Sequence, residues 1–107
     1  MKTLIYTIGY PSDFKKMCNT GWGCGYILIP LDHKFLQVIR EDEDYMYNIQ
    51  VPSFSEEITL CEIKAINGVD YRLLGFDTAH SWNNDTHNYN FDWVLNKTLE
   101  MQRIVES

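Results

Sequence analysis

Apolar and β-branched residues gather in five short segments of the chain, and turn-forming residues separate them, a pattern typical of β-strands. These segments are residues 2–8, 26–29, 45–51, 57–65 and 71–77. The 107 residues leave room for one core of ordinary size, and no repeat or linker divides them. The sequence therefore predicts a single domain over residues 1–107, built on a sheet of about five strands.

The most specific local signal is a hairpin between the last two segments. Asn67-Gly68 separates them, and this dipeptide suits a tight turn in which both central residues have positive φ. Side chains in residues 57–65 alternate between two faces, as expected for a strand with one buried side. Tight hairpins join antiparallel strands, so the sheet is predicted to be mostly antiparallel.

A helix is predicted after the sheet, from about Phe91 to Val105. Its apolar stripe recurs at helical spacing and consists of Phe91, Val94, Leu95, Thr98, Met101 and Val105. Asn90 or Asn88 can cap the first turn, and Asp92 complements the helix dipole there. A helix of this length needs a packing surface. The predicted fold class is therefore α+β, with the helix packed on one face of the sheet.

Three glycines, Gly21, Gly23 and Gly25, precede the second predicted strand. Because they lack a Cβ atom, they let the backbone bend sharply or approach another group closely. They do not have the strand-turn-helix setting of a dinucleotide-binding loop. Pro30 ends the strand that follows, and residues 31–40 are expected to form a loop and a short helix.

The chain carries 9 basic and 15 acidic residues, a net charge of -6. Phosphate binding needs clustered lysine and arginine, so this balance excludes a nucleic-acid backbone as the main partner. Two interpretations of the acidic excess are open. It keeps the protein in solution, or it forms a surface that imitates DNA and blocks a nucleic-acid-binding protein.

The densest charge is the run Glu41, Asp42, Glu43 and Asp44. Four adjacent carboxylates repel one another, so the run is expected to be a solvated loop. It lacks the spacing of a calcium-binding loop, which leaves a hard-cation site as the minor alternative. The run is the candidate contact for a protein partner.

Cysteine usage and hydropathy bear on the compartment. Three cysteines, an odd number, and the lack of a secretory signal indicate free thiols in a reducing cytosol. No apolar run approaches the roughly 20 residues of a membrane span. A cytoplasmic protein without membrane contact is therefore expected.

The most polar group at a strand end is Asp77 together with His80. In one interpretation Asp77 only shapes the turn that leaves the sheet. In the other, Asp77 and His80 form a ligand site with His33, and Tyr26 and Trp82 supply aromatic faces that suit a base or nucleotide. The spacing of the histidines matches no common metal motif, so no metal or cofactor is predicted.

Catalysis has weaker support than binding. Cys24 could act as a nucleophile if a histidine stabilised its thiolate, but such a cysteine is usually buried and inert. Asp77 and His80 could serve a small hydrolase, and a chain of this length usually needs an oligomer to build a pocket. A homo-oligomer therefore stays open, and an enzyme is the less favoured interpretation.

Four blocks of residues follow a pattern seen elsewhere: Cys-Gly-Tyr-Ile at 24–27, Ile29-Pro30 with His33, Ile-Thr at 58–59, and Gly-Phe-Asp-Thr-Ala-His at 75–80. Together they resemble a family of small bacteriophage-encoded proteins. The family pattern runs Cys-Gly-Tyr-Val, Val-Pro and His-Pro, then His-Gly-Gly with a following Thr, then Trp-Phe-Gly-Phe-Asp-x-Ala-His and a helix. The resemblance covers about residues 22–105.

Two departures from the family pattern matter. Ser55-Glu56-Glu57 stands where the family has His-Gly-Gly, and Lys34 follows His33 in place of proline. If the missing histidine belongs to a shared site, that site is altered or lost here, and a metal becomes less favoured.

The resemblance implies a phage accessory protein expressed in the cytosol of a bacterial host, but no activity that can be transferred. The first hypothesis is a counter-defence protein that binds and inhibits a host bacterial defence component. The second is a binding protein that sequesters a small nucleotide-type signal. The third is a small hydrolase that uses Asp77 and His80.

Overall fold

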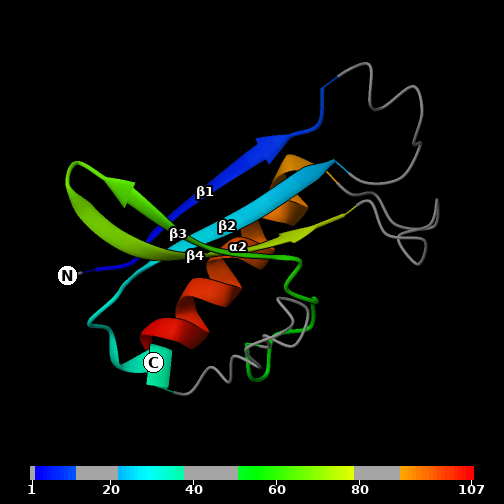
Figure 1. The fold of residues 1–107 in the computed structure, drawn as a ribbon. Helices are drawn as coiled ribbons and strands as arrows, with labels where there is room; N and C mark the ends of the chain where they lie inside the picture. The colour runs from blue at the N-terminus through cyan, green and yellow to red at the C-terminus, as the bar shows by residue number, and fades with distance from the viewer. Residues whose placement is uncertain (1, 12–21, 38–50, 79–89) are drawn as a thin grey trace.

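Four antiparallel strands and one long helix form an α+β fold in the computed structural model, which describes residues 2–11, 22–37, 51–78 and 90–107 (Figure 1). The strands are β1 (Leu4–Gly9), β2 (Gly23–Pro30), β3 (Leu60–Ile66) and β4 (Val69–Asp77). A short 3-10 helix, η1 (Lys34–Gln37), follows β2, and the long helix is α2 (Phe91–Glu106). The predicted loop and short helix after Pro30 are confirmed.

The strand order is β1-β2-β4-β3, and every neighbouring pair is antiparallel. The two inner strands are therefore β2 and β4, while β1 and β3 lie at the edges. The sequence predicted about five strands, whereas the described residues form four. The additional strand was predicted over residues 45–51, of which only Val51 is described. Val51 lies outside any strand but is buried in the core.

The hairpin between β3 and β4 is confirmed in detail. Ile66 pairs with Val69, and the two residues between them have positive φ, 51° at Asn67 and 78° at Gly68. A two-residue loop with this geometry is a type I′ turn, whose twist matches that of the flanking strands. Strand β3 begins at Leu60, three residues later than predicted. The Thr59 N–H still donates to the Gly75 carbonyl at 2.8 Å, and Ile58 is buried in the core.

Glycine lets β2 begin at Gly23, earlier than predicted. A Cβ atom on Gly23 would lie 2.0 Å from the carbonyl oxygen of Ile8, and one on Gly25 would lie 2.1 Å from Oγ1 of Thr98. The backbone therefore approaches both the neighbouring strand and helix α2 more closely than a side chain would allow. The predicted close approach is confirmed at these two positions.

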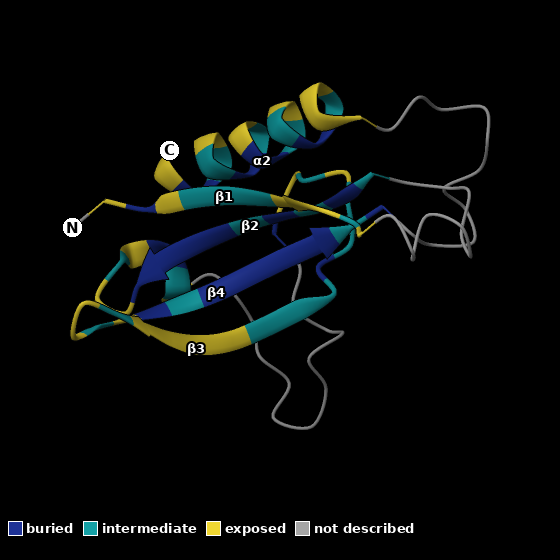
Figure 2. Ribbon diagram, turned by 90° about the horizontal axis from the view of Figure 1, so that it is seen from above, coloured by how far each residue is buried: buried dark blue, intermediate teal, exposed yellow. Residues whose placement is uncertain are grey.

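The main core lies between the sheet and α2, which contacts mainly β1 and β2 (Figures 1 and 2). Its buried residues are Ile27, Ile29, Phe35, Val51, Ile58, Leu74, Phe76, Val94, Met101 and Val105. Four of the predicted stripe residues of α2 are buried, which confirms its packing face. Asn90 is the cap, since its Oδ1 accepts a bond from the Trp93 N–H at 2.8 Å.

The opposite side of the sheet carries a second apolar cluster. Leu28 and Leu73 are buried at its centre, beside Tyr71, and partly buried side chains surround them. We call this side the open face, because no described helix lies over it; it carries Leu4, Tyr6, Ile8, Tyr26, Leu28, Leu60, Glu62, Lys64, Ile66, Val69, Tyr71 and Leu73.

Candidate functional site

Two of the sequence blocks that carry the family resemblance lie side by side in the sheet. Residues 24–26 of β2 pair with residues 75–77 of β4, with Cys24 opposite Asp77 and Tyr26 opposite Gly75. The pairing places both blocks at one end of the two inner strands. The two sequence blocks therefore form one continuous part of the structure.

Thr78 fastens this end of the sheet. Its side chain is fully buried, and its Oγ1 accepts bonds from the N–H groups of Trp22 and Gly23 at 2.9 and 3.1 Å. The same hydroxyl donates to the Gly23 carbonyl at 2.8 Å. A hydroxyl that is buried must find partners, and here it holds the residue after β4 against the start of β2. Thr78 thus performs the holding role that one interpretation gave to Asp77.

Tyr10 completes the same group, which we call the strand-end cluster: Tyr10, Cys24, Asp77 and Thr78. The Tyr10 hydroxyl accepts a bond from the Thr78 N–H at 3.2 Å and a long contact from the Cys24 thiol at 3.9 Å. Tyr10, which directly follows β1, is thus bonded to Thr78, which directly follows β4.

The electrostatics of the strand-end cluster disfavour ionisation of its thiol and phenol. Burial, followed by the charge of Cys24, raises the pKa of Tyr10 well above its ordinary value. Burial also raises the pKa of the Cys24 thiol, and the hydrogen bonds that favour the thiolate are weaker causes. A nucleophilic cysteine needs a lowered pKa, so the arrangement keeps Cys24 as a thiol at neutral pH.

An aromatic stack occupies the open face next to this cluster. The rings of Tyr6 and Tyr26 lie with centroids 4.7 Å apart and planes 18° from parallel. Lys64 places its Nζ 5.7 Å from the centroid of the Tyr6 ring, within cation–π range. Gly75 makes room for this stack, because a Cβ atom there would lie 2.7 Å from the Tyr26 ring. Burial raises the pKa of Tyr26, which keeps its hydroxyl protonated.

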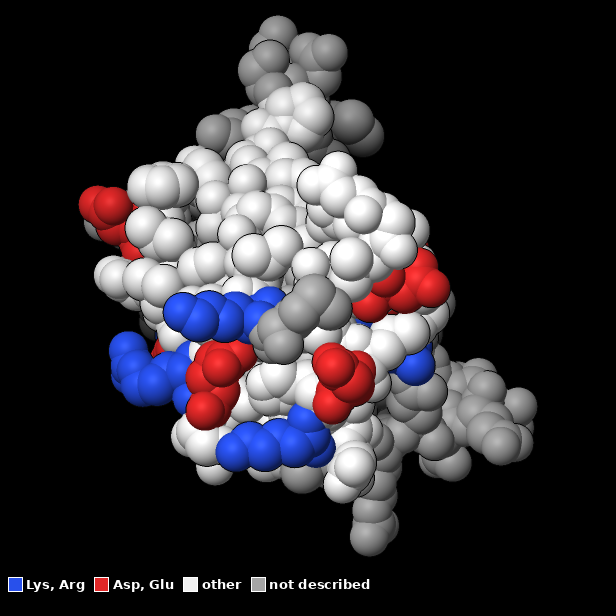
Figure 3. All heavy atoms as spheres, turned by 90° about the vertical axis from the view of Figure 1, so that its left-hand side faces the viewer, with Lys and Arg blue, Asp and Glu red and all other residues white. Residues whose placement is uncertain are grey.

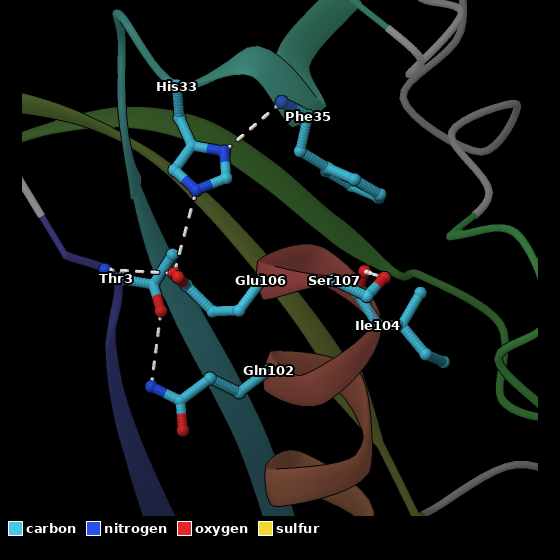
Figure 4. A network of polar contacts seen from close by, with 7 residues as sticks. All are labelled: Thr3, His33, Phe35, Gln102, Ile104, Glu106 and Ser107. Atoms are coloured by element: carbon cyan, nitrogen blue, oxygen red, sulfur yellow. Dashed lines mark hydrogen bonds and ion pairs between the residues drawn. The ribbon is translucent and has the colours of Figure 1, made fainter.

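His33, the third residue of the predicted ligand site, lies elsewhere. Its Nδ1 accepts a bond from the Phe35 N–H at 3.1 Å, and its Nε2 lies 3.5 Å from Oε1 of Glu106 (Figure 4). The same carboxylate oxygen accepts the Thr3 N–H at 3.3 Å, and Gln102 donates to the Thr3 hydroxyl at 3.1 Å. We call Thr3, His33, Gln102 and Glu106 the terminal clasp.

The structure does not bring His33 to Asp77. His33 follows the last residue of β2, whereas Asp77 pairs with Cys24 near its first residue. A strand rises about 3.3 Å per residue, so the length of β2 separates the two by about 20 Å. A common site for Asp77 and His33 is therefore not formed, because the antiparallel register places them at opposite ends of the sheet.

The remaining predicted site residues cannot be placed. His80 and Trp82 lie outside the described residues, as does the acidic run Glu41, Asp42, Glu43 and Asp44. Of the three predicted ligand residues that the structure describes, Tyr26 and Asp77 lie at the same end of the sheet and His33 at the other.

In residues 2–11, 22–37, 51–78 and 90–107, no group of three or more His, Cys, Asp or Glu side chains could hold a metal ion. None of the helices described is both long and apolar enough to cross a membrane. The end of the molecule that carries the β3–β4 turn shows acidic and basic side chains intermixed rather than one sign (Figure 3).

Sequence reasoning missed Tyr10 and Thr78, the two residues that organise the strand-end cluster. Tyr10 stands between Gly9 and Pro11, turn-forming residues that drew no chemical interpretation. Thr78 stood between Asp77 and His80, whose side chains drew the chemical interpretation. One signal was present: Thr78 directly follows a strand that is buried along most of its length, where a hydroxyl must bond internally.

Comparison with protein-family models, with curated proteins and with solved structures finds no match. The interpretation of the site therefore depends on its geometry. The strand-end cluster holds protonated thiol and phenol groups, and the open face offers stacked rings, aliphatic side chains and an ammonium group. This set of groups can bind by stacking, apolar contact and charge, and it lacks an activated nucleophile among the residues described.

Proposed function

We propose that the protein acts by binding, as a phage accessory protein that inhibits a bacterial defence component through the open face of its sheet. The observation that carries the proposal is the exposed apolar surface around the Tyr6–Tyr26 stack. Leu4 and Ile8 on this face are 44% and 53% exposed, beside the stacked rings. Large apolar side chains that are exposed side by side mark interaction surfaces more often than apolar side chains exposed singly.

The chemistry of the face suits a protein partner. Tyrosine is enriched at protein interfaces, where its ring is buried and its hydroxyl stays near water. Glu62 and Lys64 stand at the β3 side of the face and are both exposed, as the polar rim of an interface requires. A net charge of -6 argues against a nucleic acid in this place.

The test is protection of a sensitive phage. The protein would be expressed in bacteria that carry single defence systems, and infection by a phage that each system restricts would be scored as plaques. Restored plaque formation with one system supports the proposal and identifies the target. Failure to restore plaques with every system, with the protein expressed and folded, would overturn it.

Two substitutions in β3 locate the contact. Lys64→Glu reverses a charge on the open face, whereas Ile63→Glu changes an exposed neighbour on the other face of the strand. We expect Lys64→Glu to reduce protection at least tenfold and Ile63→Glu to leave it intact. Equal effects of the two variants would exclude the open face as the contact.

A nucleotide-type signal is the second candidate ligand, and the placement of Lys64 over the Tyr6 ring favours it. Stacked aromatic faces bind bases, and a nearby ammonium attracts phosphate. Thermal unfolding with a panel of cyclic and linear nucleotides tests this candidate. A ligand at 100 times its dissociation constant stabilises the fold by about 2.7 kcal/mol, so the absence of any shift excludes capture of the compounds tested.

A hydrolase is the least supported candidate. It depends on His80, which lies outside the described residues. Asp77 lies in the strand-end cluster, where burial keeps the neighbouring thiol and phenol protonated. No contact among the described residues favours this activity over binding.

A further inference from the structure

The outer edge of β1 carries a row of backbone groups directed away from the sheet. In the sheet formed by the described residues, β1 is the first strand in the order and pairs with β2 alone. The Tyr10 N–H donates to the Trp22 carbonyl at 2.8 Å, which continues the register in which Gly9 faces Gly23. Alternate residues of an antiparallel strand direct both backbone groups toward the same neighbour. Residues with even numbers in β1 therefore face β2.

The intervening residues, Ile5, Thr7 and Gly9, direct their N–H and C=O groups outward. Thr3 obeys the same alternation, and its outward N–H is bonded to Glu106 of the terminal clasp. Among the residues that the structure describes, none bonds to the outward groups of the other three. Within the described part of the chain, a ladder of three residues therefore stays open beside the clasp.

The two edges of the sheet differ in their protection against further pairing. Edge strands are usually shielded by charged side chains, proline or a covering element. β3 carries Glu62 and Lys64, whereas β1 has the sequence LIYTIG, without charge or proline. Leu4 and Ile8 add exposed apolar area to β1. In the described part of the chain, α2 packs beside β1 on the helix side, but the edge of β1 has no charged side chain or proline. An apolar edge of this kind can accept another strand.

We propose that the partner at this edge is a second copy of the same chain, paired antiparallel about a two-fold axis at Thr7. In this register Thr7 faces Thr7, while Ile5 faces Gly9 on both sides of the axis. All three outward residues then find partners, and the occupied N–H of Thr3 is not needed. On the open face, Ile8 of each copy lies opposite Tyr6 of the other, an aromatic and β-branched pair that favours strand pairing.

A second copy fits the edge because the edge is complementary to itself. The outward backbone groups of Ile5, Thr7 and Gly9 are evenly spaced. They can therefore pair with the same groups of an antiparallel second copy, as a closed two-fold interface requires. The product is one continuous sheet of eight strands, in which the two open faces adjoin. This inference does not depend on the proposed function and is tested by assembly alone.

The first test uses the backbone at Thr7. Wild-type protein is expected to sediment as a dimer with twice the mass of its 12.6 kDa chain. Thr7→Pro removes an N–H that β2 does not use, so the monomer fold should persist while the dimer is lost. Thr7→Val keeps the N–H and should remain dimeric. A monomeric wild-type protein at the highest attainable concentration would overturn the proposal.

The second test fixes the register and does not need proline. Directly opposed residues of an antiparallel pair place their Cβ atoms about 5 Å apart, so like charges there repel. Thr7→Lys and Thr7→Glu are each expected to be monomeric, and an equal mixture of the two should recover the dimer. Both variants remaining dimeric, or a mixture that stays monomeric, would contradict an axis at Thr7.

Discussion

A single buried hydroxyl organises the strand-end cluster. Thr78 is the only residue whose side chain reaches both N–H groups at the start of β2 in the described structure. It directly follows Asp77, and its own N–H donates to the Tyr10 hydroxyl at 3.2 Å. The position of the neighbouring Asp77 therefore depends on the hydrogen bonds of Thr78.

Replacing Thr78 with valine should be strongly destabilising. Thr78→Val leaves the buried N–H of Gly23 and the neighbouring N–H of Trp22 without their acceptor, and each lost partner costs about 1–3 kcal/mol. We expect the free energy of unfolding to fall by about 3 kcal/mol, measured by urea denaturation. Thr78→Ser keeps the hydroxyl and should lose less than half as much. Equal losses in the two variants would show that packing, not hydrogen bonding, is responsible.

Glu106 should make stability depend on pH in the acid range. Hydrogen bonds from Thr3, and then the nearby His33, lower the pKa of this carboxyl below its ordinary value of 4.5. A carboxyl whose pKa is lower in the folded state stabilises the fold above its unfolded pKa, and the contribution disappears as pH falls through the folded value.

The variant Glu106→Gln tests this dependence. It should be less stable than wild type at neutral pH, and the difference should shrink as pH falls below about 4. Because Glu106 is exposed to solvent over two fifths of its side chain, we expect a small effect. Unfolding curves at a series of pH values provide the measurement. A difference that is constant with pH would exclude the carboxylate as its cause.

Helix α2 and strand β2 approach each other at a point that tolerates only glycine. A Cβ atom on Gly25 would meet Oγ1 of Thr98 at 2.1 Å and the Phe76 ring at 2.6 Å. The Thr98 hydroxyl is itself bonded to the Val94 carbonyl at 2.7 Å, so it cannot easily turn aside. The absence of a side chain at Gly25 therefore allows the short distance between the sheet and α2.

The glycine at this contact should be far more sensitive than the one in the turn. Gly25→Ala overpacks the core and is expected to lower stability by about 3 kcal/mol. Gly68→Ala meets no neighbouring atom and should lose about 1 kcal/mol, because only its positive φ is strained. Denaturation of both variants, with Thr98→Ala added to the first, would measure the clash. No recovery in the double variant would indicate that the Phe76 ring is the dominant obstacle.

The first turn of α2 supplies a milder test at the scale of the element. Asn90→Ala removes the side-chain acceptor for the Trp93 N–H, and such caps contribute about 1 kcal/mol. Asn90→Asp keeps an acceptor and adds a charge that the helix dipole favours. We expect the alanine variant to be less stable and the aspartate variant to equal wild type. The reverse order in thermal unfolding would contradict the cap.

At the scale of the molecule, local sequence patterns predicted the individual elements better than the way these elements are arranged in space. The Asn67-Gly68 turn and the cap at Asn90 follow from short-range chemistry, and both appear where the sequence placed them. The joint site of Asp77 and His33 failed because strand order and register decide which strand ends meet. Nothing in the spacing of the residues encodes that order.

The terminal clasp has a consequence for the rate at which the protein unfolds. It joins Thr3 to Glu106, residues separated by 103 positions, so it closes the longest loop of any described contact. Loop closure of this length is entropically costly and is expected late, after the folding transition state. Contacts absent from the transition state act on the unfolding rate. Glu106→Ala, which removes the acceptor of the Thr3 N–H, should therefore speed unfolding in stopped-flow experiments while folding proceeds at its wild-type rate.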